Sequence, residues 1–428
     1  MDDFTELDTR LYPGNTRGYM DKYIYFVGKP YPIGGAIETC RELGFKVGLF
    51  LDKNFPTKSR ANFDEIIEVD FTTPNTIIQS ISDANPQHVS GLVCTFENYI
   101  IAKSVIAEQL HLPAPSINSA RMSTDKNLMR QAFMKADKNI TPNFGLISSE
   151  DELLRLASQL QYPLMLKPTN LVKSLLILKC ANEQELISNY RYAKERIGEL
   201  YEKYKIYDRE PQLIIEEYIT GNTCSVAAFV DNMGVPHFCD GIVSLENASD
   251  IGVDDNYIYA RHLPADFNDE LSAQIFDVAT KGIKALDMRS TPAHVELIYN
   301  DGGVKLIEIG ARIGGYRPRM YDIAYGVELI EQEIKLALGE LPELSGTFKA
   351  YTAVYELFPS SEGTFDKILG ATDTSRYAYY AVKAQEGATI GPAKNGYKAA
   401  VIIIVSHEDK QTFQEICETV RSIQVRIR

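Results

Sequence analysis

The chain lacks paired cysteines. Its six cysteines are scattered and no two of them form a Cys-x-x-Cys pair: Cys40, Cys94, Cys180, Cys224, Cys239 and Cys417. This pattern favours a reducing compartment. No apolar stretch near the N-terminus resembles a signal peptide, so we expect a cytoplasmic protein.

Long runs of one chemical character are also missing. The longest apolar runs, such as residues 399–405, are far shorter than the ~20 residues that a membrane helix needs. No long basic run is present and the formal net charge is −14, so the footprint of a nucleic-acid-binding protein is absent. We find no internal repeat and no low-complexity tract. We therefore expect a soluble protein that binds neither nucleic acid nor membrane.

A chain of 428 residues is long enough for two or three domains with ample core. Residues 23–27, 46–51 and 91–95 are typical of strands separated by helices, which predicts an α/β domain that opens with a βαβ unit. The proline-rich run 112–116 interrupts this alternation and predicts a boundary near residue 118. The pattern that follows predicts an α+β region and then, over residues 351–405, a strand-rich segment before one final helix.

The glycine-bearing turn after the first strand raises the alternative of dinucleotide binding. Gly28, Gly34 and Gly35 do not form the Gly-x-Gly-x-x-Gly spacing, although Asp52 closes the second strand much as a ribose-binding acid would. Tight turns between a strand and a helix need glycine for backbone reasons alone. We therefore favour an ordinary turn at this position.

A pair of acidic residues flanks a predicted hairpin turn. Glu296 and Glu308 lie on either side of residues 300–303, in two runs that are both typical of strands. If the loop comprises residues 301–303, Glu296 stands opposite Glu308 and His294 opposite Gly310. A slip by one residue would mix the two faces, so the apolar positions favour this register. They are Val295, Leu297, Ile307 and Ile309, which it places together on the other face.

Two like charges directly opposite each other destabilise a sheet unless something positive lies between them. A divalent cation is the obvious candidate between Glu296 and Glu308. Arg312, on the same face as Glu308, adds a fixed cation suited to a phosphate or a carboxylate. The alternative is a solvent-facing hairpin whose long carboxylates point into water.

Two lysines are candidate anion-binding residues. Lys167 emerges from the apolar run 162–168 next to a proline that cannot extend a sheet, so it is placed to meet an anion. The alternative is a lysine at a strand end that reaches solvent. Lys126 lies in the first turn of the helix predicted over residues 126–136, where an ordinary exposed helical lysine is the alternative.

A third candidate is an acidic strand end. The apolar strand that begins at Leu213 ends in Glu216 and Glu217 just before a glycine turn at Gly221. Backbone groups of such a hinge can pair with the edge of an adenine ring, while Tyr218 and Ile219 supply apolar walls.

Taken in this order, these pieces resemble the ATP-grasp superfamily. Within it, the ending 308–315, Glu-Ile-Gly-Ala-Arg-Ile-Gly-Gly, resembles the carboxylate-amine ligases that join amino acids. The resemblance covers nearly the whole chain and implies a mixed α/β and α+β architecture. It implies a pre-ATP-grasp α/β domain over residues 1–118, a two-part ATP-grasp core over 119–343 with a lid at about 140–220, and a small β-rich cap over 344–428.

The resemblance also implies a role for each matched residue. ATP and magnesium, with manganese as the alternative metal, are the implied cofactors, and Glu296 with Glu308 are the implied metal ligands. Arg312, Glu308 and Lys167 would serve catalysis, with Arg312 steadying the transferred phosphoryl group. The implied nucleotide-binding residues are Lys126, Lys167, Glu216, Glu217, Tyr218 and Ile219. The implied substrate-binding residues are His262, from the stretch Arg261-His262-Leu263-Pro264, and Gly314, Gly315, Tyr316, Arg317 and Arg319, the two arginines as a carboxylate clamp.

Three positions depart from the usual pattern of the family. The loop 169–175 contains no glycine, whereas relatives cover the phosphates with a glycine-rich loop, so Lys173 and Ser174 are the expected phosphate donors. Thr223 stands where many relatives have an acid for the ribose hydroxyls. Gly310 stands where many have an asparagine as a third metal ligand. Two glutamates therefore remain as the expected metal site.

The implied reaction is an ADP-forming ligation of small molecules. A substrate carboxylate attacks the γ-phosphate of ATP to give an acyl phosphate, and an amine then displaces phosphate to leave an amide or a dipeptide. One alternative is a nucleotide-binding regulatory or scaffold protein that has lost the chemistry, which the glycine-free loop and Thr223 also fit. A ligase of nucleotide-precursor synthesis or a carboxylase subunit is another. A homodimer through the N-terminal domain would be ordinary for the family.

Overall fold

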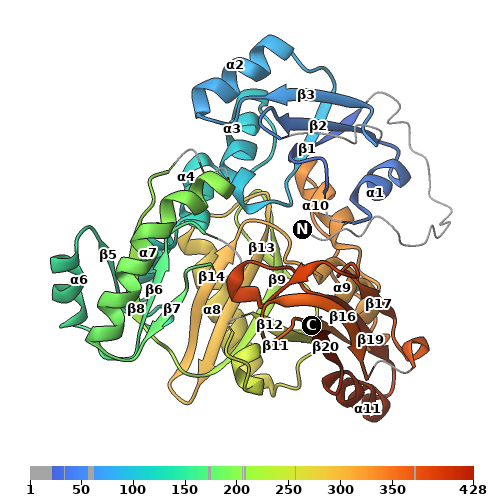
Figure 1. Cartoon of the computed structure of the whole chain (residues 1–428). Helices are drawn as coiled ribbons and strands as arrows, with labels where there is room; N and C mark the ends of the chain where they lie inside the picture. The colour runs from blue at the N-terminus through green and yellow to red at the C-terminus, as the bar shows by residue number, and fades with distance from the viewer. Residues whose placement is uncertain are drawn as a thin grey trace.

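The structure, a computed structural model, describes residues 22–32, 34–55, 62–171, 175–204, 206, 209–255, 257–370 and 373–428. These residues form three lobes around a central antiparallel sheet (Figure 1). The N-terminal domain (blue) lies above the sheet, a small green lobe lies to its side, and the red C-terminal strands extend it on the other side. Within these ranges, no helix is long and apolar enough to cross a membrane.

The N-terminal domain is a parallel sheet flanked by helices, which confirms the βαβ prediction. Its strand order is β3-β2-β1-β4. Strands β1 and β2 are almost entirely buried, as expected of parallel strands with both faces covered. The elements are β1 (Tyr23–Gly28), α1 (Ala36–Glu42), β2 (Lys46–Asp52), β3 (Glu65–Val69), α2 (Pro74–Ala84), β4 (Val89–Val93) and α3 (Ile100–Leu110).

The turn after β1 is filled by the protein's own side chains. Gly28 has φ +112°, and a Cβ on it would lie 2.5 Å from the ring of Tyr99. The Tyr99 hydroxyl donates a hydrogen bond of 2.7 Å to Asp52, whose carboxylate is buried. Asp52 also accepts from the backbone N–H of Asn54 at 2.9 Å. The glycine therefore serves a close approach of the Tyr99 ring, as an ordinary turn requires.

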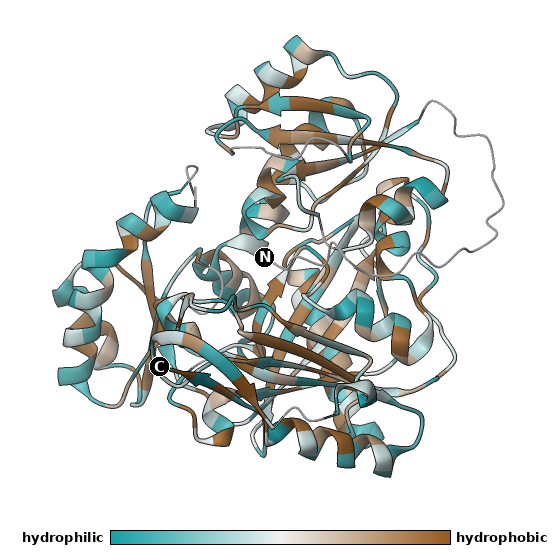
Figure 2. Cartoon of the chain, turned by 45° about the vertical axis from the view of Figure 1, so that its right-hand side comes forward, coloured by the Kyte–Doolittle hydropathy of each residue, from teal (hydrophilic) through white to brown (hydrophobic). Residues whose placement is uncertain are grey.

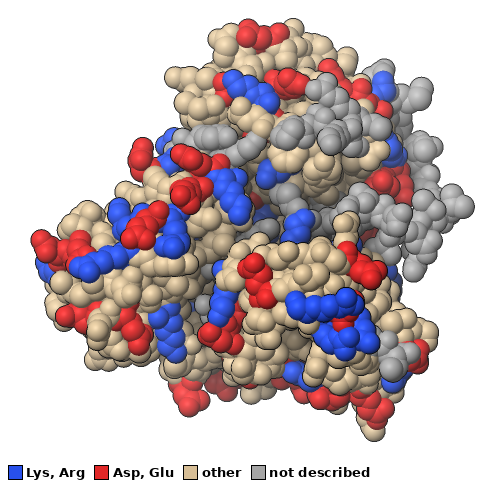
Figure 3. All heavy atoms as spheres, in the orientation of Figure 1, with Lys and Arg blue, Asp and Glu red and all other residues tan. Residues whose placement is uncertain are grey.

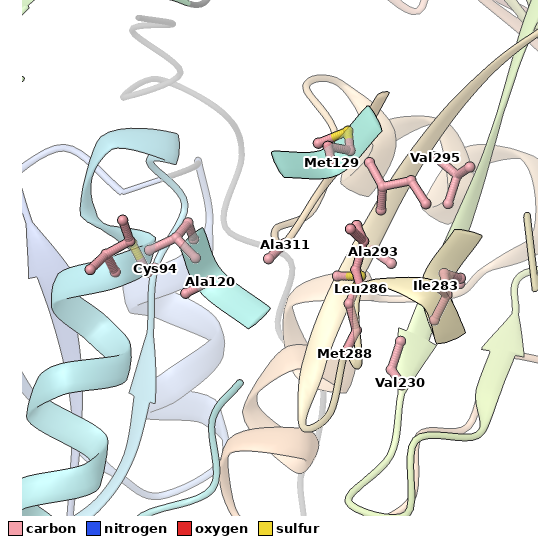
Figure 4. Packing of buried hydrophobic residues seen from close by; sticks show 14 of the residues in the cluster. Cys94, Ala120, Met129, Val230, Ile283, Leu286, Met288, Ala293, Val295 and Ala311 are labelled. Carbon is pink, nitrogen blue, oxygen red and sulfur yellow. The ribbon is translucent and has the colours of Figure 1, made fainter. Parts of the chain in front are cut away.

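The central sheet has nine strands in the order β14-β13-β9-β11-β12-β15-β19-β17, with β10 pairing β9 off that path. One face packs on α5 (Lys126–Ala136) and α8 (Asp269–Ala285). Figure 4 shows this packing, with Val230, Ala293 and Val295 of the sheet beside Ile283 of α8 and Met129 of α5. The strands are β9 (Asn222–Val230), β10 (Pro236–Phe238), β11 (Val243–Asn247), β12 (Ile258–Leu263), β13 (Thr291–Asn300), β14 (Gly303–Gly310), β15 (Tyr351–Leu357), β17 (Tyr379–Val382) and β19 (Val401–His407).

The other face of the sheet is covered by α9 (Arg317–Tyr325) and α10 (Leu329–Ala337). Gly326 adopts φ +73° and ends α9, so the chain turns before α10 begins. Figure 2 shows hydrophobic colour along strands of the central sheet, whereas helices at the outside of the molecule show more hydrophilic colour.

The green lobe is a four-stranded antiparallel sheet, β5-β8-β6-β7, backed by two helices. Its strands and helices lie within residues 144–217. Basic and acidic side chains are interspersed on the face shown in Figure 3. Within this lobe, Arg191 pairs with Glu150 at 2.7 Å. The elements are α4 (Ile117–Thr124), which precedes α5, then β5 (Phe144–Ile147), α6 (Glu150–Ala157), β6 (Leu164–Pro168), β7 (Leu178–Cys180), α7 (Glu183–Tyr204) and β8 (Leu213–Glu217).

The C-terminal segment contributes strands to two sheets. Strands β15, β17 and β19 extend the central sheet, while β16 (Gly363–Leu369), β18 (Thr389–Ile390) and β20 (Gln424–Ile427) form a three-stranded sheet. The expectation that the segment ends in one helix is wrong, because β20 follows α11 (Lys410–Arg421) and pairs with β16.

Candidate active site

The predicted register of the carboxylate hairpin is confirmed at its acidic end. Glu296 of β13 pairs with Glu308 of β14, and His294 pairs with Gly310. Ser225 of β9 lies opposite Glu296 on the other side. Glu308 lies on β14, the edge strand of the sheet, and Glu296 lies beside it on β13, so the pair stands next to the rim of the sheet.

The predicted loop of this hairpin is wrong by one residue. Asn300 pairs with Gly303, so the loop has two residues, and the register shifts between Glu296 and Leu297. Leu306, instead of Ile307, therefore lies opposite Leu297. Ile307 is the extra residue of a β-bulge, and its side chain is only half-buried. Both residues are apolar, so the hydrophobic pattern did not distinguish them.

Each of the two glutamates already has a partner. Lys126 Nζ lies 3.3 Å from a carboxylate oxygen of Glu308, and this ammonium holds the pKa of Glu308 at about 2. The Glu308 side chain is 37% exposed, so solvent screens the attraction. His294 Nε2 lies 3.1 Å from Glu296 Oε1.

The two carboxylates fit a hard divalent cation. Within the described ranges, no group of three or more His, Cys, Asp or Glu is arranged to hold a metal. Magnesium is commonly held by one or two carboxylates, with phosphate and water completing the shell. Glu296 and Glu308 match that donor set, with oxygen ligands that remain partly open to solvent.

The ring of His294 packs closely against Gly314. Its ring is buried, and burial lowers the pKa of His294, so the neutral ring is favoured. A Cβ on Gly314 would lie only 2.5 Å from His294 Nδ1, which shows how closely the backbone approaches the ring. By contrast, a Cβ on the next residue, Gly315, would meet nothing within 4 Å.

Gly314→Ala is therefore expected to push His294 away from Glu296 and to lower kcat by ~10-fold or more, since a misplacement of about 1 Å can cost ~10²-fold. Gly198→Ala, on α7 away from the site, is the matched control, because a Cβ there also meets nothing within 4 Å, and it should leave kcat within about two-fold of the wild type. The comparison is made by steady-state kinetics of ADP release, the activity that the resemblance implies. Equal effects of the two substitutions would contradict the positional role of His294.

Arg312 is held by a residue that the sequence analysis did not identify. Its Nε lies 2.7 Å from Glu97 Oε2, and its Nη1 donates to the Ile313 carbonyl at 2.9 Å. Glu97 follows β4, at the carboxyl end of the parallel sheet, where loops of α/β domains commonly carry binding residues. A Cβ on Gly310 would lie 3.2 Å from the same Glu97 oxygen, so the glycine leaves room for this carboxylate.

The start of the glycine-free loop is held against α5. The backbone N–H of Lys126 donates to the Thr169 carbonyl at 2.8 Å, and Lys126 Nζ lies 3.3 Å from the Leu171 carbonyl. Asn170 donates to Asp125 at 3.1 Å. The two expected phosphate donors that follow, Lys173 and Ser174, lie outside the described residues.

Lys167 and Glu216 form a buried ion pair on the inner face of the lid sheet. Arg130 of α5 joins them, with Nε 3.0 Å from Glu216 Oε2. Burial lowers the pKa of Lys167 to about 8. Burial also raises the pKa of Glu216, but Arg130 and Lys167 outweigh this effect and hold it at about 2. The carboxylate expected to contact adenine is therefore engaged by two cations.

The other hinge residues lie around this pair. Glu217 accepts from the Asn143 side chain at 2.9 Å, so its carboxylate is also engaged. The Tyr218 ring lies under Lys179, with Nζ 4.0 Å from the ring centroid, and Ile219 is half-buried. The Thr223 hydroxyl lies 3.2 Å from the side-chain nitrogen of Asn247.

The two arginines expected to clamp a carboxylate have different partners within the protein. Arg317 is 1% exposed and donates from Nη2 to the Ser225 hydroxyl at 2.7 Å. Arg319 instead pairs with Asp322 of the same helix at 3.1 Å. Both arginines belong to α9, and residues two apart on a helix point in different directions. Tyr316, just before α9, donates its hydroxyl to Glu356 at 2.9 Å.

Arg317 is a buried cation on the face that carries Glu296. Burial lowers the pKa of its guanidinium to about 10. Among the described residues, no carboxylate lies within ion-pair distance of Arg317, and its Nε has no hydrogen-bond partner. Buried charges are normally paired, so this guanidinium is suited to a carboxylate or phosphate supplied by a ligand.

His262 lies on the face of the sheet opposite the one that carries Glu296. It pairs with Ser244, which pairs with Cys224, whereas Glu296 pairs with the next residue, Ser225. Successive residues of a strand point to opposite faces, so His262 points away from the carboxylates. Its ring packs against Tyr355 and Phe413, with centroids 5.7 and 6.2 Å away, and burial lowers its pKa to about 4.

Comparison with known proteins identifies the domain that carries this site. Residues 160–318 match the family model described as the ATP-grasp domain. The crystal structure of the L-amino acid ligase from Bacillus licheniformis superposes with a TM-score of 0.77 at 19% identity, covering 96% of this chain and 99% of that one. The chain thus has the ATP-grasp fold.

Two curated relatives match this chain over only part of their own length. The uncharacterized protein y4rH of Sinorhizobium fredii is 23% identical over 313 residues, which is 72% of this chain and 61% of the relative. The D-alanine–D-alanine ligase of Bacillus velezensis is 28% identical over 221 residues, which is 48% of this chain and 54% of the relative. The matches therefore span somewhat more than half the length of these relatives.

Proposed function

We propose that this ATP-grasp protein is an ADP-forming ligase that joins a small carboxylate to an amine, with amino-acid-like substrates and an amide or dipeptide as product. The observation that carries the proposal is the convergence of Glu296 and Glu308 with Lys126 and Arg312 at one rim of the sheet. The likeness to the L-amino acid ligase of Bacillus licheniformis supports the choice of substrate class.

Each group of site residues is assigned to one part of ATP. Magnesium, or manganese in its place, would be held by Glu296 and Glu308 and would neutralise charge on the phosphates. Lys126 and Lys167 add two cations to the phosphate region, and the backbone of the Tyr218 hinge faces adenine. Because the Glu216 carboxylate is engaged by cations, we assign adenine contacts to the backbone rather than to this side chain.

The reaction proceeds in two balanced steps. A carboxylate oxygen of the first substrate attacks the γ-phosphorus, the bond to the bridging oxygen breaks, and ADP leaves with that electron pair. The amine of the second substrate then attacks the acyl carbon, phosphate leaves, and the nitrogen loses one proton. Arg312 neutralises charge on the transferred phosphoryl group, and Glu97, 2.7 Å from Arg312, offers a carboxylate to the amine.

Arg317→Met is expected to raise the KM for the substrate whose carboxylate Arg317 binds by ~10- to 100-fold, because a hydrogen bond to a charged group contributes ~1.5–3 kcal/mol. The value of kcat should change little. Arg319→Met is the matched control, since that arginine pairs with Asp322 on the same helix. A loss confined to kcat would show instead that Arg317 acts on the transition state.

The pH dependence should report Lys167. The protonated lysine attracts the phosphates, so kcat/KM for ATP is expected to be full below the Lys167 pKa and to fall as the pH rises through about 8. Lys167→Arg should move this limb upward, because arginine remains charged. An unchanged limb in Lys167→Arg would assign the titration to another group.

Isotope transfer tests the mechanism directly. With a substrate whose carboxylate is labelled with ¹⁸O, one label atom is expected in each phosphate released, because a carboxylate oxygen becomes the bridge to phosphorus. The amine substrate carries no label in this experiment, so any label in the phosphate comes from the carboxylate substrate. Phosphate without label, at a normal rate of turnover, would show that water attacks ATP and would overturn the proposed acyl phosphate.

A second candidate function is nucleotide binding without chemistry. One observation favours it: Lys126 and Lys167, the two residues assigned to the phosphates, are each paired with a carboxylate of the protein. A regulatory protein of this kind would bind ATP and release no phosphate with any pair of amino acids. The ligase proposal requires that both lysines exchange these partners for phosphate.

A further inference from the structure

Arg130 links three parts of the site although no role has been assigned to it. It lies on α5, one turn after Lys126, and is 1% exposed. Its Nε lies 3.0 Å from Glu216 Oε2 on the lid strand β8. Its Nη2 donates to the Ile307 carbonyl at 2.8 Å, at the bulge next to Glu308.

The bulge explains how one side chain reaches both strands. Ile307 is the extra residue of edge strand β14, so its carbonyl is not used by the pairing with β13. Arg130 takes this carbonyl and thereby connects the residue beside the metal ligand Glu308 to the hinge residue Glu216. A guanidinium is suited to this task because its donors point in fixed, divergent directions.

The charges in this cluster are unequal. Two cations, Arg130 and Lys167, share the single carboxylate of Glu216, and all three side chains are at most 7% exposed. If Lys167 were the sole partner, turning it toward a phosphate would leave Glu216 buried and unpaired. Breaking a buried pair in that way is strongly destabilising. Arg130 can retain Glu216 while Lys167 leaves it.

We propose that Arg130 is a positioning residue that keeps Glu216 paired and so frees Lys167 for ATP, while it ties the lid hinge to the metal-binding strand. The inference rests on the proposed ATP site. It implies that Glu216 serves as a resting partner for Lys167 in the absence of nucleotide. Because Arg130 keeps Glu216 paired, Lys167 can exchange this carboxylate for a phosphate without leaving a buried unpaired charge.

Nucleotide binding to variants tests the release of Lys167. Arg130→Met should raise the Kd for Mg-ATP by ~10-fold or more, because Lys167 is then held as the sole partner of Glu216. Adding Glu216→Gln removes the carboxylate and should recover most of that loss. Lys135→Met removes an exposed charge from the same helix and serves as the control. If the affinity for Mg-ATP does not recover in the double variant, the proposal is overturned. A loss of affinity caused only by missing structural contacts of Arg130 would not be repaired by Glu216→Gln.

Stability measurements decide the same point without nucleotide. Arg130→Met and Lys167→Met should each lower the denaturation midpoint modestly, because one cation still holds Glu216. The double variant should lose more than the sum of the two, since the carboxylate is then unpaired. Additive losses would overturn the proposal. If Arg130→Met does not fold, a folded yield restored by Glu216→Gln supports it and an unrestored yield contradicts it.

The two experiments separate the failure of this proposal from the failure of the proposed function. A wild-type chain that does not bind Mg-ATP would contradict the ligase assignment, and the stability cycle would still decide whether Arg130 and Lys167 share Glu216.

Discussion

Glu308→Ala is expected to abolish ADP formation, with a fall in kcat of at least ~10³-fold, at the upper end of what one preorganised electrostatic group contributes. Glu308 is the carboxylate that faces Glu296 across the hairpin and that Lys126 contacts at 3.3 Å. Its loss removes half of the proposed metal site. The measurement is ADP release under saturating ATP, magnesium and both substrates.

The fold should survive this substitution. Glu308 is 37% exposed, so its pair with Lys126 contributes little to stability and the denaturation midpoint should be nearly unchanged. Asp301→Ala, in the exposed turn of the same hairpin, removes a carboxylate outside the site and is the matched control. Retained turnover in Glu308→Ala, with the fold intact, would contradict the assignment of Glu308 as a metal ligand.

Arg312→Met is expected to lower kcat by ~10³-fold while changing the KM for ATP little, because an arginine that neutralises a transferred phosphoryl group acts mainly in the transition state. Glu97→Gln should have a smaller effect, near ~10-fold, since it leaves the guanidinium charge in place and removes only its carboxylate partner. Single-turnover ADP formation measures both.

The outcomes of these two variants distinguish alternative roles. A rise in KM with kcat unchanged in Arg312→Met would show that the arginine binds ground-state ATP rather than the transferred group. Equal losses in Arg312→Met and Glu97→Gln would show that the pair works as one unit, with Glu97 fixing the guanidinium through the 2.7 Å contact.

Local patterns predicted the hairpin correctly where the two faces differ in polarity. Alternation of charged and apolar residues set Glu296 against Glu308, and the structure has that pairing. The pattern could not reveal the bulge, because Ile307 and Leu306 are equally apolar and either can face Leu297. The hairpin closes with a two-residue turn, in which Gly302 N–H donates to the Asn300 side chain at 2.8 Å. This turn sets the register of the residues next to it, on the far side of the bulge from Glu296 and Glu308.

Residues that come from distant segments were beyond the reach of local patterns. Glu97 meets Arg312 across 215 positions of the chain, and Arg130 meets Ile307 across 177. Their sequence neighbourhoods show an acid after a strand and a basic residue in a helix, both of which are common. Only the docking of the N-terminal domain and of α5 on the sheet rim brings them into the site.

The substrate residues were the least predictable part. Arg317 and Arg319 looked equivalent until the start of α9 placed them on different sides of one helix. His262 matched a local motif, but the pairing of β12 with β11 turned it away from the carboxylates. Such orientations depend on helix boundaries and strand register, which single residues do not encode.

Release of phosphate and ADP from Mg-ATP, measured against amino acids supplied singly and in pairs, tests the central claim most directly. The proposed ligase should release both only when a particular carboxylate and amine are present together, and mass spectrometry should find the corresponding amide. Bound Mg-ATP with no release across the whole matrix would contradict ligation of amino acids and would favour nucleotide binding without chemistry.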